Sequence, residues 1–497
     1  MQSSAISRHS RAAGLERLKD SRLLKEFAYV DGAWRASASG RFLSVSDPAT
    51  GEWIGQVPAL TGTEALESIA AAERAFPSWS ALLPQQRSNV LRGWQDQMIA
   101  HREDLAILIT LEQGKPLSEA RGEIDYAASF IEFYAEEAKR TNIESVTAHL
   151  AGAEASVRRQ PMGVAALVTP WNFPSAMLTR KAAAALAAGC TAVAHPSRYT
   201  PFSALALAEL AERAGLPAGV FNVVTGEAEE VVTPMTAAAA VRALSFTGST
   251  ETGRLLYRQC APTIKTLILE LGGHAPFIVF ADADLDRAVD CAIAAKFATS
   301  GQDCLAANRI LVERSTYDAF AARFAERVKA LTVGPGLLDS DIGPLMNEAA
   351  VGKQERHVAD ALARGARLML GGGRHNAGPL FFQPTVLADV PQDALIFQEE
   401  TFGPVAALAA FESEADLLAH VNATDYGLVA YLHTRDPGRV SRLSAALQYG
   451  MIAVNRTKIT GAPIPFGGVK QSGLGREGSR LGIEAFMDVK YVCQDAA

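Results

Sequence analysis

Residues 163–194 read GVAALVTPWNFPSAMLTRKAAAALAAGCTAVA, and this stretch decides the fold. The apolar run 163–169 is typical of a buried strand. The Ala- and Leu-rich segment 176–188 predicts a helix that ends at Gly189, and a second apolar strand follows at 190–194. A strand, a helix and a strand in close succession predict a parallel β-sheet with helices on both faces.

The same alternation continues along the chain. We expect a further helix at 202–214 and strands at 220–224 and 243–246. A second set of elements follows, with strands at 267–269, 277–280 and 310–312 and helices at 285–298 and 317–331. We therefore predict an α/β protein with two parallel-sheet domains that are joined near residue 270.

Two segments depart from this alternation. Residues 143–159 mix polar and apolar residues alternately, which predicts a β-hairpin that projects from the body. Residues 488–493 have the pattern of a strand that pairs with another element.

The composition excludes several classes of protein. Hydrophobic residues make up 48% of the 497 residues and charged residues 20%, which excludes wholesale disorder. The formal charge of −7 argues against a nucleic-acid partner. The longest nearly apolar run, 182–194, is too short to span a membrane. The nine histidines include no HxH or HxxxH pair, so we expect no metal site.

The cysteines and the first residues of the chain give an expectation for the cellular compartment of the protein. The first 20 residues lack the apolar centre of a secretory signal. The chain has five cysteines and no CxxC pair, which argues against a disulfide framework and for a reducing cytoplasm. These cysteines are Cys190, Cys260, Cys291, Cys304 and Cys493.

Three polar residues are candidates for chemistry. Cys304 follows a helix and lies in a glycine-containing turn, FATSGQDC (297–304). Glu270 ends an apolar strand just before two glycines, and Asn172 follows another strand on a rigid turn between prolines. The carboxyl ends of strands are where α/β sheets keep their sites, so Glu270 and Asn172 are functional candidates. Taken singly, Cys304 would be a small buried hydrophobe and Asn172 a turn residue.

Together these segments resemble the aldehyde dehydrogenase superfamily, and the resemblance runs from about Phe27 to Cys493. Within it the chain looks most like bacterial succinate-semialdehyde dehydrogenases, on PFSALALAELAERAGLPAGVFNVVTG (201–226) and SGLGREGSRLGIE (472–484). The motifs that carry the superfamily resemblance are LEQGKP (111–116), PWNFP (170–174), FTGSTETG (246–253), LELGG (269–273), GQDC (301–304), EETFGP (399–404) and PFGGVKQSGLGREG (465–478).

The resemblance implies an organisation in three parts. Residues 21–141 and 161–269 would form a Rossmann-like NAD(P)-binding domain, and residues 270–455 the catalytic domain. Residues 142–160 and 479–497 would form a small β-structured oligomerisation element, after an N-terminal extension over 1–20. Strand pairing across subunits would give a homodimer or a homotetramer.

The resemblance also implies a mechanism for oxidising an aldehyde to a carboxylic acid. Cys304 would attack the carbonyl as a thiolate, and the Asn172 side chain with the Cys304 backbone N–H would stabilise the oxyanion. Glu270 would be the general base that activates water against the thioester, which argues against transfer to coenzyme A. Lys181 would support a proton relay from Glu270, with a solvated helix lysine as the alternative.

The cofactor implied is NAD or NADP. Gly248 and Ser249 would hold the pyrophosphate at a helix N-terminus, and Glu400 and Phe402 would hold and face the nicotinamide riboside. Trp171 belongs to the same implied cofactor site.

The ribose motif departs from the family pattern Lys-Pro-(Ala/Ser)-Glu. Here it reads His195-Pro196-Ser197-Arg198, so His195, Ser197 and Arg198 are the implied ribose residues. Arg198 reverses the charge of the usual glutamate and could pair with a 2′-phosphate, which favours NADP slightly. His195 in place of lysine weakens the site for either cofactor.

The implied substrate is an aldehyde that carries a carboxylate, with succinate semialdehyde first and glutarate semialdehyde as an alternative. Asp303, beside the nucleophile, should raise the thiol pKa, and it suggests an aminoaldehyde as a further alternative. Two hypotheses compete with this interpretation. In one, Arg180 and Arg309 form structural ion pairs and do not bind substrate, and in the other the chain is a non-catalytic relative of the family. The implied substrate residues are Arg180, Arg309, Thr460, Asp303, Arg456 and Lys458.

Overall fold

An eight-stranded sheet organises the first half of the molecule in the computed structural model, which describes residues 11–140 and 143–495. Its strand order is β19-β11-β10-β7-β8-β9-β1-β2, and β7 to β11 run parallel, as predicted. The strands are β1 (Ala28–Val30), β2 (Ala33–Arg35), β7 (Val164–Val168), β8 (Thr191–His195), β9 (Phe221–Val223), β10 (Val241–Thr247), β11 (Thr266–Glu270) and β19 (Gly473–Leu474).

Helices cover both faces of this sheet, which confirms the prediction. Because side chains alternate along a strand, Ala165 and Leu167 of β7 join one core cluster, and Val164 and Val168 join the other. The first cluster contains α2 (Pro84–Ala100), α3 (Arg102–Gln113), α4 (Leu117–Glu137), α5 (Pro174–Ala188) and α6 (Pro201–Arg213). The second contains α1 (Gly62–Ser80), α7 (Ala228–Ala237) and α8 (Thr250–Cys260).

Helix α5 begins and ends where the sequence indicates. Pro174 occupies its first turn, where a missing N–H costs nothing, and Gly189 ends it with a φ of 101°.

A seven-stranded sheet organises the second half, in the order β14-β15-β16-β13-β12-β17-β18. Helices α9 and α10 pack on one face, and α11, α13 and α14 on the other. The strands are β12 (Ala275–Val279), β13 (Ala307–Glu313), β14 (Arg367–Leu370), β15 (Thr385–Ala388), β16 (Val405–Phe411), β17 (Val429–His433) and β18 (Met451–Val454). The helices are α9 (Leu285–Phe297), α10 (Arg314–Val328), α11 (Glu348–Ala363), α12 (Leu395–Gln398), α13 (Glu414–Asn422) and α14 (Pro437–Ala446).

Both sheets also carry antiparallel strands at their edges, which the sequence did not predict. The edge strands β1, β2 and β19 of the first sheet and β14 of the second pair antiparallel. Apart from β14, these edge strands are at most three residues long, and β1 and β19 lie far along the chain from β9 and β11, the strands with which they join the sheet. A local apolar pattern therefore does not reveal them.

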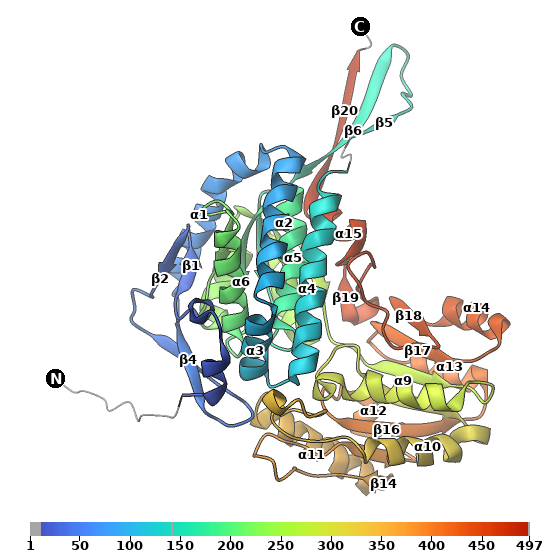
Figure 1. The fold of residues 1–497 in the computed structure, drawn as a ribbon. Coiled ribbons are helices and arrows are strands. Elements are labelled where there is room, and N and C mark those ends of the chain that lie inside the picture. The colour runs from blue at the N-terminus through green and yellow to red at the C-terminus, as the bar shows by residue number, and fades with distance from the viewer. Residues whose placement is uncertain (1–10, 141–142, 496–497) are drawn as a thin grey trace.

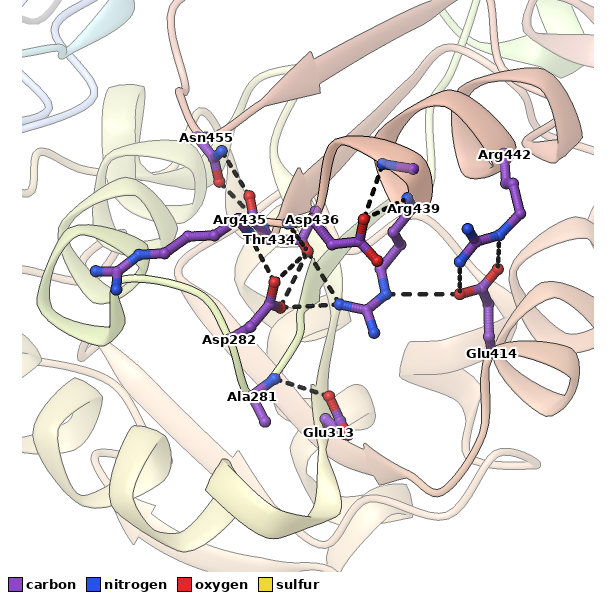
Figure 2. Close-up of polar contacts among 11 residues, drawn as sticks. Ala281, Asp282, Glu313, Glu414, Thr434, Arg435, Asp436, Arg439, Arg442 and Asn455 are labelled. Carbon is purple, nitrogen blue, oxygen red and sulfur yellow. Dashed lines mark hydrogen bonds and ion pairs between the residues drawn. The ribbon is translucent and has the colours of Figure 1, made fainter.

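Ion pairs close the carboxyl ends of the second sheet (Figure 2). Asp282, just after β12, accepts hydrogen bonds from the Thr434 hydroxyl at 2.8 Å and from Arg439 Nη1 at 2.9 Å. Asn455, just after β18, donates to the Thr434 carbonyl at 2.8 Å. Three strand ends and the start of α14 are thereby tied together.

A small sheet, β20-β6-β5, extends away from the rest of the molecule (Figure 1). Strands β5 (Ile143–Val146) and β6 (Ala153–Pro161) form the predicted hairpin, and β20 (Met487–Asp495) pairs antiparallel with the whole of β6. Both strand predictions are confirmed.

The remaining elements are short, apart from the antiparallel pair β3 (Phe42–Ser46) and β4 (Trp53–Pro58). No helix among the described residues has both the length and the apolar character that a membrane crossing requires. The short elements are η1 (Ala13–Arg17), η2 (Ser21–Leu23), η3 (Ala261–Thr263), η4 (Ala298–Gly301), η5 (Gly336–Leu338), η6 (Lys470–Ser472) and α15 (Ser479–Glu484).

Candidate active site

A cavity of about 800 Å³ lies where the carboxyl ends of the first sheet meet the amino ends of the second. Glu270 is the last residue of β11, Gly248 follows β10 and Trp171 comes just after β7. Cys304 comes three residues before β13 begins at Ala307. All four residues line this one cavity, so the two sheets build it together.

A tight turn presents Cys304. Thr299 and Ser300 have φ values of 50° and 57°, which non-glycine residues seldom adopt, and Gly301 follows at 72°. A Cβ atom on Gly301 would collide with the backbone carbonyl of Gly403, so this position requires glycine. Burial and the carboxylates of Glu270 and Asp303 raise the pKa of the Cys304 thiol well above its usual range.

Asn172 lies beside the nucleophile's turn. Its side-chain Nδ2 donates to the Gln302 carbonyl at 3.0 Å, two residues before Cys304. Both Asn172 and Cys304 line the cavity, as the oxyanion role requires.

A buried ion pair holds the Asn172 loop in place, and sequence reasoning missed it. Lys115 Nζ lies 2.6 Å from Glu123 Oε2 and donates to the Asn172 carbonyl at 2.7 Å. Glu123 Oε1 accepts the backbone N–H groups of Ser175 at 2.9 Å and Ala176 at 3.2 Å, at the start of α5. Lys115 lies in the LEQGKP motif, which was the available signal.

Glu270 is placed to act as a base. Neither of its carboxylate oxygens has a hydrogen-bond partner among the described residues, although the side chain is buried and lines the cavity. Burial raises its pKa to about 8, against 4.5 for an ordinary glutamate. A carboxylate without protein partners beside Cys304 can take a proton from water.

Lys181 is buried and is not a solvated helix lysine. Its Nζ donates to the Thr247 hydroxyl at 2.6 Å and to Glu477, whose other oxygen lies 2.6 Å from Arg180 Nε. Although burial opposes it, Lys181 and Arg180 hold the pKa of Glu477 below its usual value. Lys181 therefore pairs with Glu477 rather than Glu270. The sequence analysis did not single out Glu477, which lies in the PFGGVKQSGLGREG motif.

The residues predicted for the nicotinamide end gather on one wall of the cavity. Glu400 Oε1 accepts the Gly273 N–H at 2.9 Å, and burial raises its pKa to about 7. The Phe402 and Trp171 rings meet edge to face with centroids 5.6 Å apart.

The pyrophosphate residues fit a dinucleotide. Ser249 caps α8 by accepting the Thr252 N–H at 3.2 Å, and Gly248 and Ser249 both line the cavity. A second hollow of about 710 Å³ shares Ser249 and Glu400 with it. Small residues at a helix N-terminus, next to continuous open space, can receive phosphates.

The ribose residues lie apart from this cavity. His195 is buried at the end of β8 with its Nδ1 3.0 Å from the Val224 carbonyl, and the Ser197 hydroxyl accepts the Tyr199 N–H at 3.3 Å. Arg198 is exposed and pairs with Glu227 at 2.8 Å, which the sequence did not reveal. Arg198 would therefore have to break its ion pair with Glu227 before it could bind a 2′-phosphate.

The structure separates the predicted substrate residues into two groups. Arg180, Asp303, Lys458 and Thr460 line the cavity with Cys304.

Arg309 and Arg456, also predicted as substrate residues, do not line this cavity. Arg309 Nη2 donates to the His274 carbonyl at 3.0 Å and to the Tyr449 hydroxyl at 2.8 Å, so it fastens β13 to its surroundings. Arg456 is exposed on its loop. No group of three or more His, Cys, Asp or Glu side chains that could hold a metal occurs in residues 11–140 and 143–495.

Known proteins share this fold and these motifs. A profile of the aldehyde dehydrogenase family matches residues 34–492. The chain is 53% identical to the NADP-dependent succinate-semialdehyde dehydrogenase of Escherichia coli, over 96% of this chain and 99% of that protein. It is 52% identical to a glutarate-semialdehyde dehydrogenase of Pseudomonas aeruginosa (96% and 99%) and to a non-phosphorylating aspartate-semialdehyde dehydrogenase of Halomonas elongata (96% and 97%). The chain belongs to the aldehyde dehydrogenase family.

Proposed function

We propose that this protein oxidises a carboxylate-bearing aldehyde, succinate semialdehyde, to the corresponding dicarboxylic acid with NADP or NAD. One observation carries the proposal: Cys304, Asn172 and Glu270, whose carboxylate has no hydrogen-bond partner among the described residues, line a single cavity. A nucleophile, an oxyanion donor and a base in one place are what conversion of an aldehyde to an acid requires. Their presence also argues against a non-catalytic relative.

Cys304 forms the covalent intermediate. Its sulfur attacks the aldehyde carbon, and the negative charge moves to the oxygen, which the Asn172 side chain and the Cys304 backbone N–H stabilise. Because burial and the carboxylates of Glu270 and Asp303 raise the pKa of the thiol, Cys304 must give its proton to a base before it attacks as the thiolate. Trp171, Glu400 and Phe402 would hold the nicotinamide, which would supply the acceptor for the hydride from the aldehyde carbon.

Glu270 completes the reaction by hydrolysis. Its carboxylate takes a proton from a water molecule as the water oxygen attacks the thioester carbon, and the Cys304 thiolate leaves. Lys181 would support the relay of this proton through Thr247, which neighbours Glu270 across β10 and β11 and accepts a hydrogen bond from Lys181 Nζ at 2.6 Å.

The substrate carboxylate would bind Arg180, Lys458 and Thr460. Arg180 Nη1 is buried and has no hydrogen-bond partner among the described residues, so it can meet an anion without giving up a bond. The relatives act on aldehydes of different length and charge, so glutarate semialdehyde and an amino-substituted aldehyde stay as alternatives.

The test is the rate of reduced-cofactor formation with succinate semialdehyde, glutarate semialdehyde and a plain aliphatic aldehyde, each with NADP and NAD. A carboxylated aldehyde should exceed the aliphatic one by at least about tenfold in kcat/KM, or about 1.4 kcal/mol. Equal rates for all three would refute an anion-binding cavity.

The organisation proposed for the chain follows the two sheets. Residues 21–141 and 161–269 would bind the cofactor and residues 270–455 would carry the nucleophile, although β19, outside both ranges, completes the first sheet. The segments 142–160 and 479–497 would join subunits into a homodimer or homotetramer, since the sheet they form exposes Ile143, Val489 and Tyr491. The proposed 1–20 extension lies partly outside the described residues.

All five cysteines are free thiols. We propose a cytoplasmic location on that ground, because reducing compartments keep thiols in this state.

A further inference from the structure

The turn before the nucleophile is strained and has to be held by its surroundings. Thr299 and Ser300 both adopt the left-handed backbone conformation, with φ values of 50° and 57°. Non-glycine residues keep this conformation only where neighbouring groups fix them. The Ser300 hydroxyl donates to the Gly343 carbonyl at 3.0 Å. Gln302 Oε1 accepts the Met346 N–H at 2.9 Å. The second half of the molecule therefore holds one side of this turn.

Glu119, from the first half of the molecule, holds the other side of the turn. It lies in the first turn of α4, and its Oε2 accepts the Thr299 backbone N–H at 2.8 Å and the Thr299 hydroxyl at 3.1 Å. Helix α4 packs in the core of the eight-stranded sheet, whereas Thr299 follows α9, which packs on the seven-stranded sheet. Glu119 also lines the cavity with Cys304. One carboxylate oxygen thus joins the two halves of the molecule at the nucleophile's turn.

The Thr299 N–H depends on this acceptor because Thr299 is only 2% exposed. Without the Glu119 carboxylate, the buried N–H would lose its acceptor in a place that solvent does not reach, which is costly. The turn can reduce this cost by leaving the left-handed conformation. The sulfur and the backbone N–H of Cys304, farther along the same turn, would then move as well.

The same face of α4 also serves the oxyanion donor. Glu123 follows Glu119 by four residues on this helix, so the two side chains share one face. Glu123 pairs with Lys115, which donates to the Asn172 carbonyl at 2.7 Å. This face therefore contacts both the Asn172 loop and the turn that carries the second oxyanion donor, the backbone N–H of the nucleophile.

We propose that Glu119 is a positioning residue, which fixes the nucleophile's turn so that the Cys304 N–H and the Asn172 side chain converge on one oxygen atom. Glu119 acts through Thr299, as a hydrogen-bond acceptor, and it takes up no proton during the reaction. The inference rests on the proposed function and adds a residue to its machinery.

Two substitutions of Glu119 separate the hydrogen bonds from the rest of the side chain. Leucine fills a similar volume and offers no acceptor, whereas the carbonyl oxygen of glutamine can accept both bonds, because both reach the same oxygen. With succinate semialdehyde and NADP, Glu119→Leu should lower kcat by about tenfold or more and leave KM for NADP within about twofold. Glu119→Gln should restore kcat to within about threefold of wild type. Glu132→Leu, at an exposed position on α4, is the matched control and should leave kcat unchanged.

A second measurement does not depend on activity. Hydrogen–deuterium exchange of the peptide that spans residues 297–304 reports whether the turn is held. Its amides should exchange at least about tenfold faster in Glu119→Leu than in the wild-type protein. Glu119→Gln and Glu132→Leu should exchange at the wild-type rate.

Three results would overturn the proposal: a wild-type kcat in Glu119→Leu, an equal loss of kcat in Glu119→Gln, or unchanged exchange of the turn in Glu119→Leu. Failure of the proposed function looks different, because then the wild-type protein would not oxidise succinate semialdehyde with either cofactor. The exchange rates alone would then support or overturn the hold of Glu119 on the turn.

Discussion

Replacing Lys115 by methionine tests whether the buried Lys115–Glu123 pair positions the oxyanion donor. The change removes the 2.7 Å hydrogen bond to the Asn172 carbonyl and leaves the Glu123 carboxylate buried without its partner at 2.6 Å. Breaking a buried pair from one side costs about 3–5 kcal/mol of folding free energy. If the Asn172 side chain also leaves its place, kcat should fall by about 10² to 10³.

The assay separates these two effects. We would measure kcat and KM with the preferred aldehyde, and unfolding by urea, for Lys115→Met, Glu123→Gln and the double variant. The double variant should recover part of the stability, because no unpaired charge remains, while kcat stays low. Lys139→Met is the control, since its pair with Glu136 is exposed to solvent and contributes little to the free energy of unfolding. Values of kcat within about threefold of wild type in both single variants would refute the positioning role.

Three further predictions concern the base Glu270, the cofactor preference and the role of Arg309. Because the pKa of Glu270 is raised to about 8, only a small fraction of this carboxyl is ionised at pH 7, and the rate of thioester hydrolysis should rise about tenfold from pH 7 to pH 9. Glu270→Gln should abolish this pH dependence. A single-turnover hydrolysis rate that does not change with pH in the wild-type protein would contradict the prediction. Glu227→Gln releases Arg198 from its 2.8 Å pair, so the NADP/NAD ratio of kcat/KM should rise by about threefold or more, and an unchanged ratio would exclude Arg198 from the cofactor site. Arg309→Gln should lower the temperature of thermal inactivation and leave KM for the aldehyde within about twofold, whereas a tenfold rise in KM would return Arg309 to the substrate site.

Much of the fold could be predicted because the sequence pattern of each strand or helix lies within a short segment. The apolar run that became β7 and the Ala-rich segment that became α5 are complete signals within a few residues, and Gly189 marks the helix end by its positive φ. Glu270 and Asn172 were predictable for a related reason, since Glu270 ends one recognisable strand of the parallel sheet and Asn172 follows another.

The features that could not be predicted depend on contacts between distant residues. Glu477 meets Lys181 across almost 300 positions of sequence, and Glu227 meets Arg198 only because β8 and β9 are neighbours. Arg309 looked like a free cation because nothing in its own segment shows that the His274 carbonyl and the Tyr449 hydroxyl surround it. A motif shows that a charged residue is present at a position, but the hydrogen-bond and ion-pair partners of that residue are set by the fold.

The central claim is that Cys304 carries an acyl group which Glu270 releases. The most direct test mixes the Glu270→Gln variant with succinate semialdehyde and NADP, quenches the reaction in acid, and measures the mass of the intact protein by mass spectrometry. The account predicts a covalent adduct with the mass of one succinyl group, located on the peptide that contains Cys304 and absent from Cys304→Ala. No adduct, together with undiminished turnover in Glu270→Gln, would contradict it.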